Sequence, residues 1–281
     1  MTTAANPVDA ATSFLFVPGT RHDRFAKAAD SGADVVIVDL EDAVAPADKV
    51  SARTVVAGWC DANACVVRIN GAATPWHDDD IDALAGAPEL LAVMVPKAES
   101  IEQVESVASA VGVAVIALVE TARGVLHAAE LASSPAVARL AFGNLDFAAD
   151  CGITPGPDEL ELLAARSALV VASRAAGLPG PVDGVFTQVG DLDGLGAAVG
   201  RARRLGFAGT LCIHPEQVAV VSRRLGPSTE EIDWARRVLA ASAEHGAATL
   251  FVLDGNMVDE PVLRRARAIV AQVAPTTAGS R

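Results

Sequence analysis

The chain has 281 residues, of which 51% are hydrophobic and 20% are charged, so a large core is available and intrinsic disorder is disfavoured. Its formal charge of −13 disfavours nucleic acids and anionic membranes as partners, and no apolar run is long enough to span a bilayer. The cysteines at 60, 65, 151 and 212 lack metal-ligand spacing and the first residues lack a signal-peptide pattern, which together predict a cytoplasmic protein.

Apolar stretches of strand length recur along the chain, and helical patterns lie between them. The predicted strands are 13–18, 34–40, 65–70, 90–96, 113–120, 137–143, 182–186 and 209–215. The predicted helices are 22–31, 46–59, 99–110, 123–132, 157–176 and 191–205. Runs that are apolar on both faces are typical of parallel strands covered by helices. This order predicts an α/β fold, a (β/α)₈ TIM barrel, with a doubly wound open sheet as the alternative.

A C-terminal helical extension follows the last predicted strand. Residues 227–245 begin with a helix-start signal, in which Ser228 is the N-cap and Glu231 follows three residues later. A short apolar segment at 249–259 and a last helix at 261–273 complete the extension. We therefore predict a barrel core of residues 1–225 and an extension of residues 226–281. The extension either covers the barrel or reaches a neighbouring subunit, where we expect it to cover the active site.

Ionisable or polar residues follow most of the predicted strands. They are Arg21, Asp39, Glu41, Asp42, Arg68, Asn70, Lys97, Glu120, Arg123, Asp146 and His214. The carboxyl ends of barrel strands share one face, and the active sites of TIM barrels lie there. The acidic cluster after strand 34–40 is therefore expected at the rim of a pocket. Placement by chance is the alternative, because any strand that leaves the core passes through polar residues.

Two of these acidic residues, Glu120 and Asp146, end adjacent strands, so their carboxylates can meet. Mg²⁺ prefers oxygen ligands and often keeps several waters, so the pair predicts a magnesium site. Arg68 follows an apolar run and needs an anion, which is either Glu41 or Asp42, or the carboxylate of a substrate. A metal site beside an anion clamp suits a 2-oxo acid and the making or breaking of a bond next to its carbonyl group.

A series of motifs resembles the HpcH/HpaI aldolase group, which includes citrate lyase β-subunits and malyl-CoA lyases. The motifs are LFVPGTRHDRFAKAADSGADVVIVDLEDAVAPADK, VVRIN, VMVPKAES, ALVETARGVLHAAEL, AFGNLDFAAD, LCIHPEQVAVV and LDGNMVDEPVLRRA. They occur in order between about residues 13 and 270. The resemblance implies a TIM barrel, usually assembled as a trimer or a multiple of it. It also implies Mg²⁺-dependent cleavage or formation of C–C bonds in β-hydroxyacyl thioesters, usually of coenzyme A.

The resemblance also implies roles for residues that bind metal and substrate. Glu120 and Asp146 take the positions of the metal ligands. Arg68 takes the position that holds the carboxylate of the oxo acid. Arg21 and Lys27 match positions that contact the phosphates of coenzyme A.

Further acidic residues match catalytic positions of the family. Glu41 and Asp42 match residues that order water at the metal and support the arginine of the VVRIN motif. Asp254 matches an acid/base that a neighbouring subunit delivers, and Asp259 is an alternative for that role. The chain departs from citrate lyase β-subunits at Leu145, where those usually carry Glu, and Phe147 replaces the more usual Tyr.

The expected function is a Mg²⁺-dependent C–C lyase. Its substrate is expected to be a β-hydroxyacyl-CoA such as malyl-, citramalyl- or citryl-CoA, and its products an oxo acid and an acyl-CoA. One alternative is a citrate lyase β-subunit that acts on an acyl-carrier-protein thioester within a complex. The other is a non-catalytic subunit that binds a thioester. The expected assembly is a homotrimer or a multiple of it.

Overall fold

The computed structural model describes residues 6–245 and 250–273. The first five residues of the N-terminal segment, residue 249 of the predicted apolar segment and the polar tail 274–281 lie outside the described residues. The chain divides into two compact units, and the boundary between them follows Leu225.

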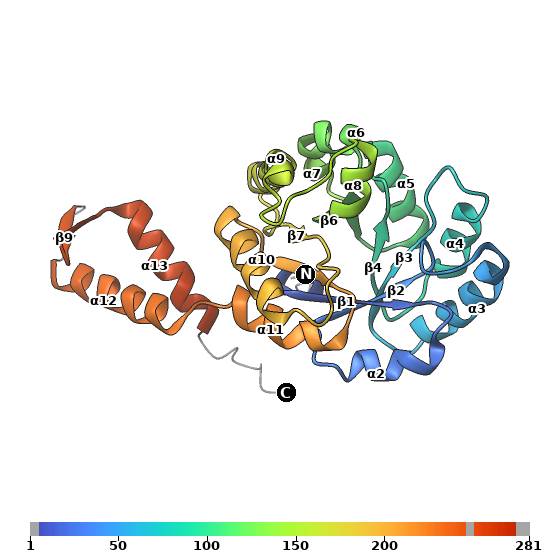
Figure 1. Ribbon diagram of the computed structural model, residues 1–281, viewed down its shortest axis with the longest axis horizontal. Helices are drawn as coiled ribbons and strands as arrows, with labels where there is room; N and C mark the ends of the chain where they lie inside the picture. Colours follow the sequence, from blue (N-terminus) through green and yellow to red (C-terminus); the bar gives the residue numbers. More distant parts are fainter. Residues whose placement is uncertain (1–5, 246–249, 274–281) are drawn as a thin grey trace. The chain divides into compact units, whose positions relative to one another are not determined.

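The first unit is a closed barrel of eight parallel strands in the order of the sequence (Figure 1). Its strands are β1 Ser13–Pro18, β2 Val35–Asp39, β3 Cys65–Arg68, β4 Leu90–Val95, β5 Val115–Val119, β6 Val137–Phe142, β7 Val182–Asp183 and β8 Gly209–Cys212. Pairing of β1 with both β2 and β8 closes the sheet. The prediction of a (β/α)₈ barrel is confirmed, and the open-sheet alternative is wrong.

The strands are apolar on both faces because each face packs in a different layer. In β2, Val35 and Ile37 belong to the cluster that fills the barrel interior. Val36 and Val38 belong to the larger cluster between the strands and the surrounding helices. Successive side chains of a strand point to opposite faces, so a run of four apolar residues supplies both layers.

Helices surround the barrel (Figure 1). They are α2 Phe25–Ala29, α3 Lys49–Cys60, α4 His77–Leu84, α5 Ile101–Val111, α6 Ala122–Leu126, α7 Ala128–Ser133, α8 Asn144–Asp150, α9 Leu163–Ala175, α10 Leu192–Leu205 and α11 Pro215–Leu225. Short 3₁₀ helices lie at His22–Arg24, Pro46–Asp48 and Leu160–Leu162. The predicted helix 123–132 is two helices that meet at His127, whose Nδ1 is 2.7 Å from the Glu99 carbonyl oxygen. Helices α4, α8 and α11 were not predicted.

The amino end of the barrel is closed by the short helix α1, Pro7–Ala10. Val8 and Ala11 join the apolar cluster of the barrel interior. The fully buried Arg139 donates hydrogen bonds to the carbonyl oxygens of Val8 and Ala11 at 2.9 and 2.6 Å. These contacts hold α1 against the strands.

Strand β7 is shorter than predicted, because the segment 182–186 leaves the sheet after Asp183. The side-chain amide of Asn144 replaces a neighbouring strand at this point. It accepts a hydrogen bond from the Val185 N–H at 3.0 Å and donates one to the Val185 carbonyl oxygen at 3.1 Å. A Cβ on Gly184 would collide with Asn144, so this contact requires glycine. The exchange links the end of β7 to the start of α8, beside the cavity described below.

The second unit contains two helices and a β-hairpin. Its elements are α12 Thr229–His245, β9 Phe251–Leu253, β10 Asn256–Val258 and α13 Glu260–Val273. A small apolar cluster holds them together, with Val238, Phe251 and Leu263 among its members. The capping box is present, since Glu231 N–H donates to Ser228 Oγ at 3.2 Å and Ser228 N–H donates to Glu231 Oε2 at 2.9 Å. Within the described residues, the helices are too short or too polar to cross a membrane.

Candidate active site

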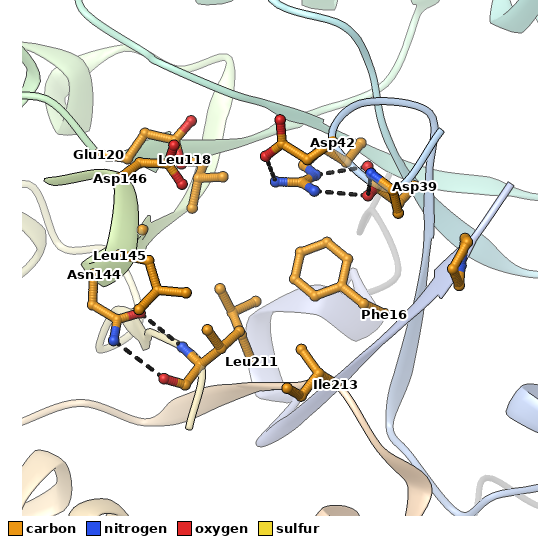
Figure 2. Close-up of a pocket in the computed structure, with 15 residues that line it drawn as sticks. Phe16, Asp39, Asp42, Leu118, Glu120, Asn144, Leu145, Asp146, Leu211 and Ile213 are labelled. Carbon is orange, nitrogen blue, oxygen red and sulfur yellow. Dashed lines mark hydrogen bonds and ion pairs between the residues drawn. The ribbon is translucent and has the colours of Figure 1, made fainter. Parts of the chain in front are cut away.

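A cavity of about 390 Å³ lies at the carboxyl ends of the strands (Figure 2). Its lining combines charged and apolar side chains. The lining residues are Phe16, Pro18, Asp39, Asp42, Ala43, Arg68, Leu118, Glu120, Gly143, Asn144, Leu145, Asp146, Val185, Leu211 and Ile213. Three residues predicted to bind metal or substrate, namely Glu120, Asp146 and Arg68, therefore line one cavity.

Arg68 forms its main ion pair with Asp39. Its Nε is 2.7 Å from Asp39 Oδ1 and its Nη2 is 2.7 Å from Asp39 Oδ2, a bidentate arrangement. The two residues are direct neighbours in the pairing of β2 with β3. Glu41 and Asp42, the partners considered from the sequence, contribute weaker contacts to Nη1 at 3.1 and 3.5 Å. Burial lowers the pKa of Arg68, but the hydrogen bonds and charge of Asp39 outweigh it and raise the pKa overall.

The loop after β2 is shaped around the Asp39 carboxylate. Oδ1 accepts a hydrogen bond from the Glu41 N–H at 2.9 Å, and Oδ2 accepts one from the Ala43 N–H at 3.1 Å. Each carboxylate oxygen therefore receives one guanidinium and one backbone donor. This arrangement holds the loop so that Glu41 and Asp42 face Arg68.

Glu41 is buried beside this pair. Its Oε1 is 3.0 Å from Lys97 Nζ. Its Oε2 is 3.1 Å from Arg68 Nη1, but in the described part of the chain it receives no hydrogen bond of good geometry. Burial raises the pKa of Glu41. A buried carboxylate oxygen without a donor is a position where water or a cation would be stabilised.

Glu120 follows β5, and Lys97, which lies just after the neighbouring strand β4, orients it. Its Oε1 accepts the backbone N–H of Lys97 at 2.9 Å, and Lys97 Nζ is 3.6 Å from the same oxygen. Lys97 has a φ of 48°, an unusual conformation for a residue with a side chain. Burial raises the pKa of Glu120 to about 8, and the charges of Glu41 and Asp146 act in the same direction.

Asp146 lies in the first turn of α8, beside Glu120 (Figure 2). The two carboxylates line the same cavity and their charges interact, because β5 pairs with β6 and α8 begins directly after β6. Gly143 makes the approach possible, since a Cβ at this position would collide with the Glu120 carboxylate. The adjacent acids predicted from the strand order are therefore brought together.

Lys49 stabilises the loop after β2 through hydrogen bonds, and this role was not predicted from the sequence. Its buried Nζ donates to the carbonyl oxygens of Leu40 and Glu41, both at 2.7 Å, and to Asn70 Oδ1 at 2.6 Å. The three acceptors use all three protons of the ammonium group. A sequence signal existed, because Lys49 shares the buried face of α3 with Ala52 and Val56.

Arg21 and Lys27 do not line the cavity. Arg21 forms a bidentate pair with Asp23 at 2.9 and 2.8 Å. Lys27 is exposed on α2. Both cations belong to the segment between β1 and β2, and they remain accessible to a ligand outside the cavity.

Asp254 belongs to the second unit. It occupies the turn between β9 and β10 with a φ of 50°, it is exposed, and its Oδ2 is 3.4 Å from Arg237 Nη2. Asp259, the alternative acid/base, accepts the Val262 N–H at 3.2 Å at the start of α13. This bond caps the start of α13.

The donor set at Glu120 and Asp146 fits a hard divalent cation. Among the described residues, no three His, Cys, Asp or Glu side chains form a ready metal cluster. Mg²⁺ needs fewer protein ligands, because it commonly binds one or two carboxylates and keeps several waters. Burial is the main cause of the raised pKa of Glu120, and the nearby carboxylates of Glu41 and Asp146 add to it. A cation bound at this position would stabilise the charged form of Glu120.

The fold and the cavity define a TIM barrel with an acidic pair and an arginine at its carboxyl face. Residues 12–215 match the family model of the HpcH/HpaI aldolase/citrate lyase family, and the chain belongs to this family.

Three known proteins illustrate the similarity. CitE from Mycobacterium tuberculosis, solved with magnesium, acetoacetate and coenzyme A, is 40% identical with a TM-score of 0.84, covering 94% of this chain and 98% of that one. The citrate lyase β-subunit from M. tuberculosis, solved with oxaloacetate and magnesium, is 38% identical with a TM-score of 0.71, covering 79% and 100%. The (3S)-malyl-CoA thioesterase of Cereibacter sphaeroides is 35% identical over 268 residues, covering 92% of this chain and 93% of the relative.

Proposed function

We propose that this protein is a Mg²⁺-dependent C–C lyase that cleaves a β-hydroxyacyl-CoA to an oxo acid and an acyl-CoA. The observation that carries the proposal is the cavity that holds Glu120, Asp146 and Arg68 together at the catalytic face of a TIM barrel. Relatives solved with magnesium and oxo acids, and in one case with coenzyme A, support it.

In this proposal Glu120 and Asp146 hold the ion, and Mg²⁺ supplies Lewis-acid stabilisation of negative charge on the substrate oxygen. Arg68 orients the substrate carboxylate next to the reacting carbon. Asp39 holds the guanidinium in place through two bonds of 2.7 Å. Arg21 and Lys27 offer positive charge for the phosphates of coenzyme A.

The proposed step is a retro-Claisen cleavage. The β-hydroxyl proton passes to water ordered by Glu41 and Asp42 and then to solvent, from which Asp254 regains the proton that it donates in each turnover. The C–C bond then breaks, the oxygen becomes the carbonyl of the oxo acid, and the bonding electron pair enters the thioester enolate. Asp254 donates a proton to the enolate carbon, which gives the acyl-CoA. The exposed position of Asp254 in the second unit is consistent with delivery to another copy in a homotrimer.

The direct test uses the purified full-length protein with malyl-, citramalyl- and citryl-CoA, with and without Mg²⁺. Release of oxo acid is followed as its hydrazone, and release of free thiol is followed in parallel. The proposal predicts oxo acid without free thiol from at least one substrate, and no product without the metal. Intact binding of coenzyme A without cleavage of any substrate would instead indicate a non-catalytic thioester-binding subunit. Cleavage of acyl-carrier-protein thioesters alone would indicate a citrate lyase β-subunit.

A second candidate is hydrolysis of malyl-CoA, and the similarity to the C. sphaeroides thioesterase favours it. In this reaction water attacks the thioester carbonyl, the C–S bond breaks, and the free hydroxy acid and the coenzyme A thiol leave. The same assay separates the two reactions, because hydrolysis releases thiol without oxo acid.

A further inference from the structure

The wall of the cavity opposite its charged groups points to a substrate class. We propose that the oxo-acid half of the substrate carries an alkyl group, and not a second carboxylate, on its carbonyl carbon. The inference rests on the proposed function, because it takes Glu120 and Asp146 to hold the metal and Arg68 to hold the first carboxylate.

The charges of the cavity leave no free cation for a second carboxylate. Among the described residues, Arg68 is the only cation in the lining, and Asp39 already binds two of its nitrogens. Lys97 is outside the lining, and its Nζ is already engaged by two carboxylates, with Glu41 Oε1 at 3.0 Å and Glu120 Oε1 at 3.6 Å. The lining also carries Asp42, so acids outnumber bases. Asp39, Asp42, Glu120 and Asp146 give the lining four carboxylates against Arg68, so even a divalent ion leaves it net negative. Under the proposed function the first substrate carboxylate is offset by direct contact with the ion and Arg68, whereas a second carboxylate would have no such contact and would add to the negative charge.

The uncharged part of the lining is mainly apolar. Asn144 is polar, but its side-chain amide is paired with the Val185 backbone. The larger apolar side chains are Phe16, Leu118, Leu145, Val185, Leu211 and Ile213. In Figure 2, Asp42, Glu120 and Asp146 lie in the upper part of the view, and Phe16, Leu211 and Ile213 lie below them. Leu145 and Ile213 are 52% and 38% exposed, although they are large hydrophobic residues. Because several such side chains face one cavity, they form a binding surface for a small apolar group.

The substituent on the carbonyl carbon of the oxo acid is the group that varies between the candidate substrates. It is hydrogen in glyoxylate, methyl in pyruvate and carboxymethyl in oxaloacetate. With the carbonyl and the first carboxylate at the metal and Arg68, this substituent extends to the apolar wall. A methyl or larger alkyl group gains burial there, whereas a carboxylate loses its water without a partner. The chain is therefore expected to use citramalyl-type thioesters in preference to citryl thioesters.

A matched pair of ligands tests this inference. The side chain of 4-methyl-2-oxopentanoate has the shape of the carboxymethyl group of oxaloacetate but no charge. Both acids and pyruvate are titrated into the full-length protein with Mg²⁺ by calorimetry, with the oxaloacetate freshly dissolved. Pyruvate and 4-methyl-2-oxopentanoate are expected to bind about tenfold or more tightly than oxaloacetate, since an unpaired buried charge is costly. Equal or tighter binding of oxaloacetate would overturn the inference.

A variant pair tests the wall itself. Leu145→Arg adds a cation at a half-exposed position, and Leu145→Met keeps the wall apolar with similar volume. The arginine variant is expected to bind oxaloacetate about tenfold more tightly than wild type, whereas the methionine variant is expected to keep the order of preference in which pyruvate binds more tightly than oxaloacetate. An unchanged preference in the arginine variant would overturn the assignment of Leu145 to this wall.

Failure of the inference and failure of the proposed function give different results. If pyruvate binds only with Mg²⁺ and oxaloacetate binds equally well, the proposed function stands and the inference falls. If neither acid binds with Mg²⁺, both fall. A relative in the same family was solved with oxaloacetate, so family membership alone does not determine which oxo acid this chain prefers. The comparison of pyruvate with oxaloacetate therefore tests a property of this chain.

Discussion

The two units of the chain each place an aspartate against an arginine, in opposite environments. In the barrel, the side chains of Asp39 and Arg68 are 3% and 11% exposed, and two bonds of 2.7 Å join them. In the second unit, Asp254 and Arg237 are 61% and 56% exposed and lie 3.4 Å apart. Burial makes the first pair a fixed part of the structure, whereas water competes for the second.

The difference matches the roles proposed for the two regions. A clamp for a substrate carboxylate must keep its geometry before the substrate arrives, and the buried pair provides this. An acid that acts on another copy of the chain must be free to leave its resting partner. The weak contact between Asp254 and Arg237 allows this at low cost.

The largest effect is expected for Arg68→Ala. This change leaves Asp39 buried without its partner, which should lower the free energy of unfolding by about 3–5 kcal/mol. It should also raise KM for the oxo acid in the condensation direction, because the bidentate contact is lost. Urea unfolding and steady-state kinetics measure both quantities, with Arg68→Lys as the matched control that keeps the charge but loses the planar fork. Unchanged stability and KM would show that the pair is not the anchor described here.

The next largest effect is expected for Asp146→Ala, which removes one of the two proposed metal carboxylates. Turnover should fall by about 10²–10³-fold or more, the cost of losing one electrostatic stabiliser. The fold should persist, because Asp146 is only half-buried in the first turn of α8. Asp150→Ala is the control for loss of an acid on the same helix. Full turnover in Asp146→Ala would remove this residue as a ligand.

The smallest effect is expected for Arg237→Ala, which breaks the exposed pair with Asp254. Stability should change by about 0–1 kcal/mol, since both side chains are solvated. Thermal unfolding of this variant beside Arg68→Ala compares the two ion pairs directly. A loss from Arg237→Ala as large as that from Arg68→Ala would erase the contrast between the two units.

The barrel could be predicted because eight apolar runs of strand length follow one another along the chain, with helical patterns between them. The sequence also predicted the meeting of Glu120 and Asp146, because adjacent strands of a parallel barrel end on one face. These inferences depend only on strand order, which local patterns reveal.

The contacts that shape the site could not be predicted in the same way. The choice of Asp39 over Glu41 and Asp42 as the main partner of Arg68 depends on the register of β2 with β3. Lys97 combines a left-handed conformation with a backbone hydrogen bond to Glu120, which lies 23 positions away. Asn144 lies at the end of β7 through two hydrogen bonds with Val185, which is 41 positions away. Such features arise from tertiary packing, which no local pattern encodes.

Binding of Mn²⁺, a spectroscopic substitute for Mg²⁺, tests most directly whether Glu120 and Asp146 form a metal site. Electron paramagnetic resonance counts the bound ion in wild type and in the isosteric variants Glu120→Gln and Asp146→Asn. One ion per chain should bind to wild type and be displaced by Mg²⁺, and each variant should bind it at least about tenfold more weakly. Equal affinity in wild type and both variants would contradict the account.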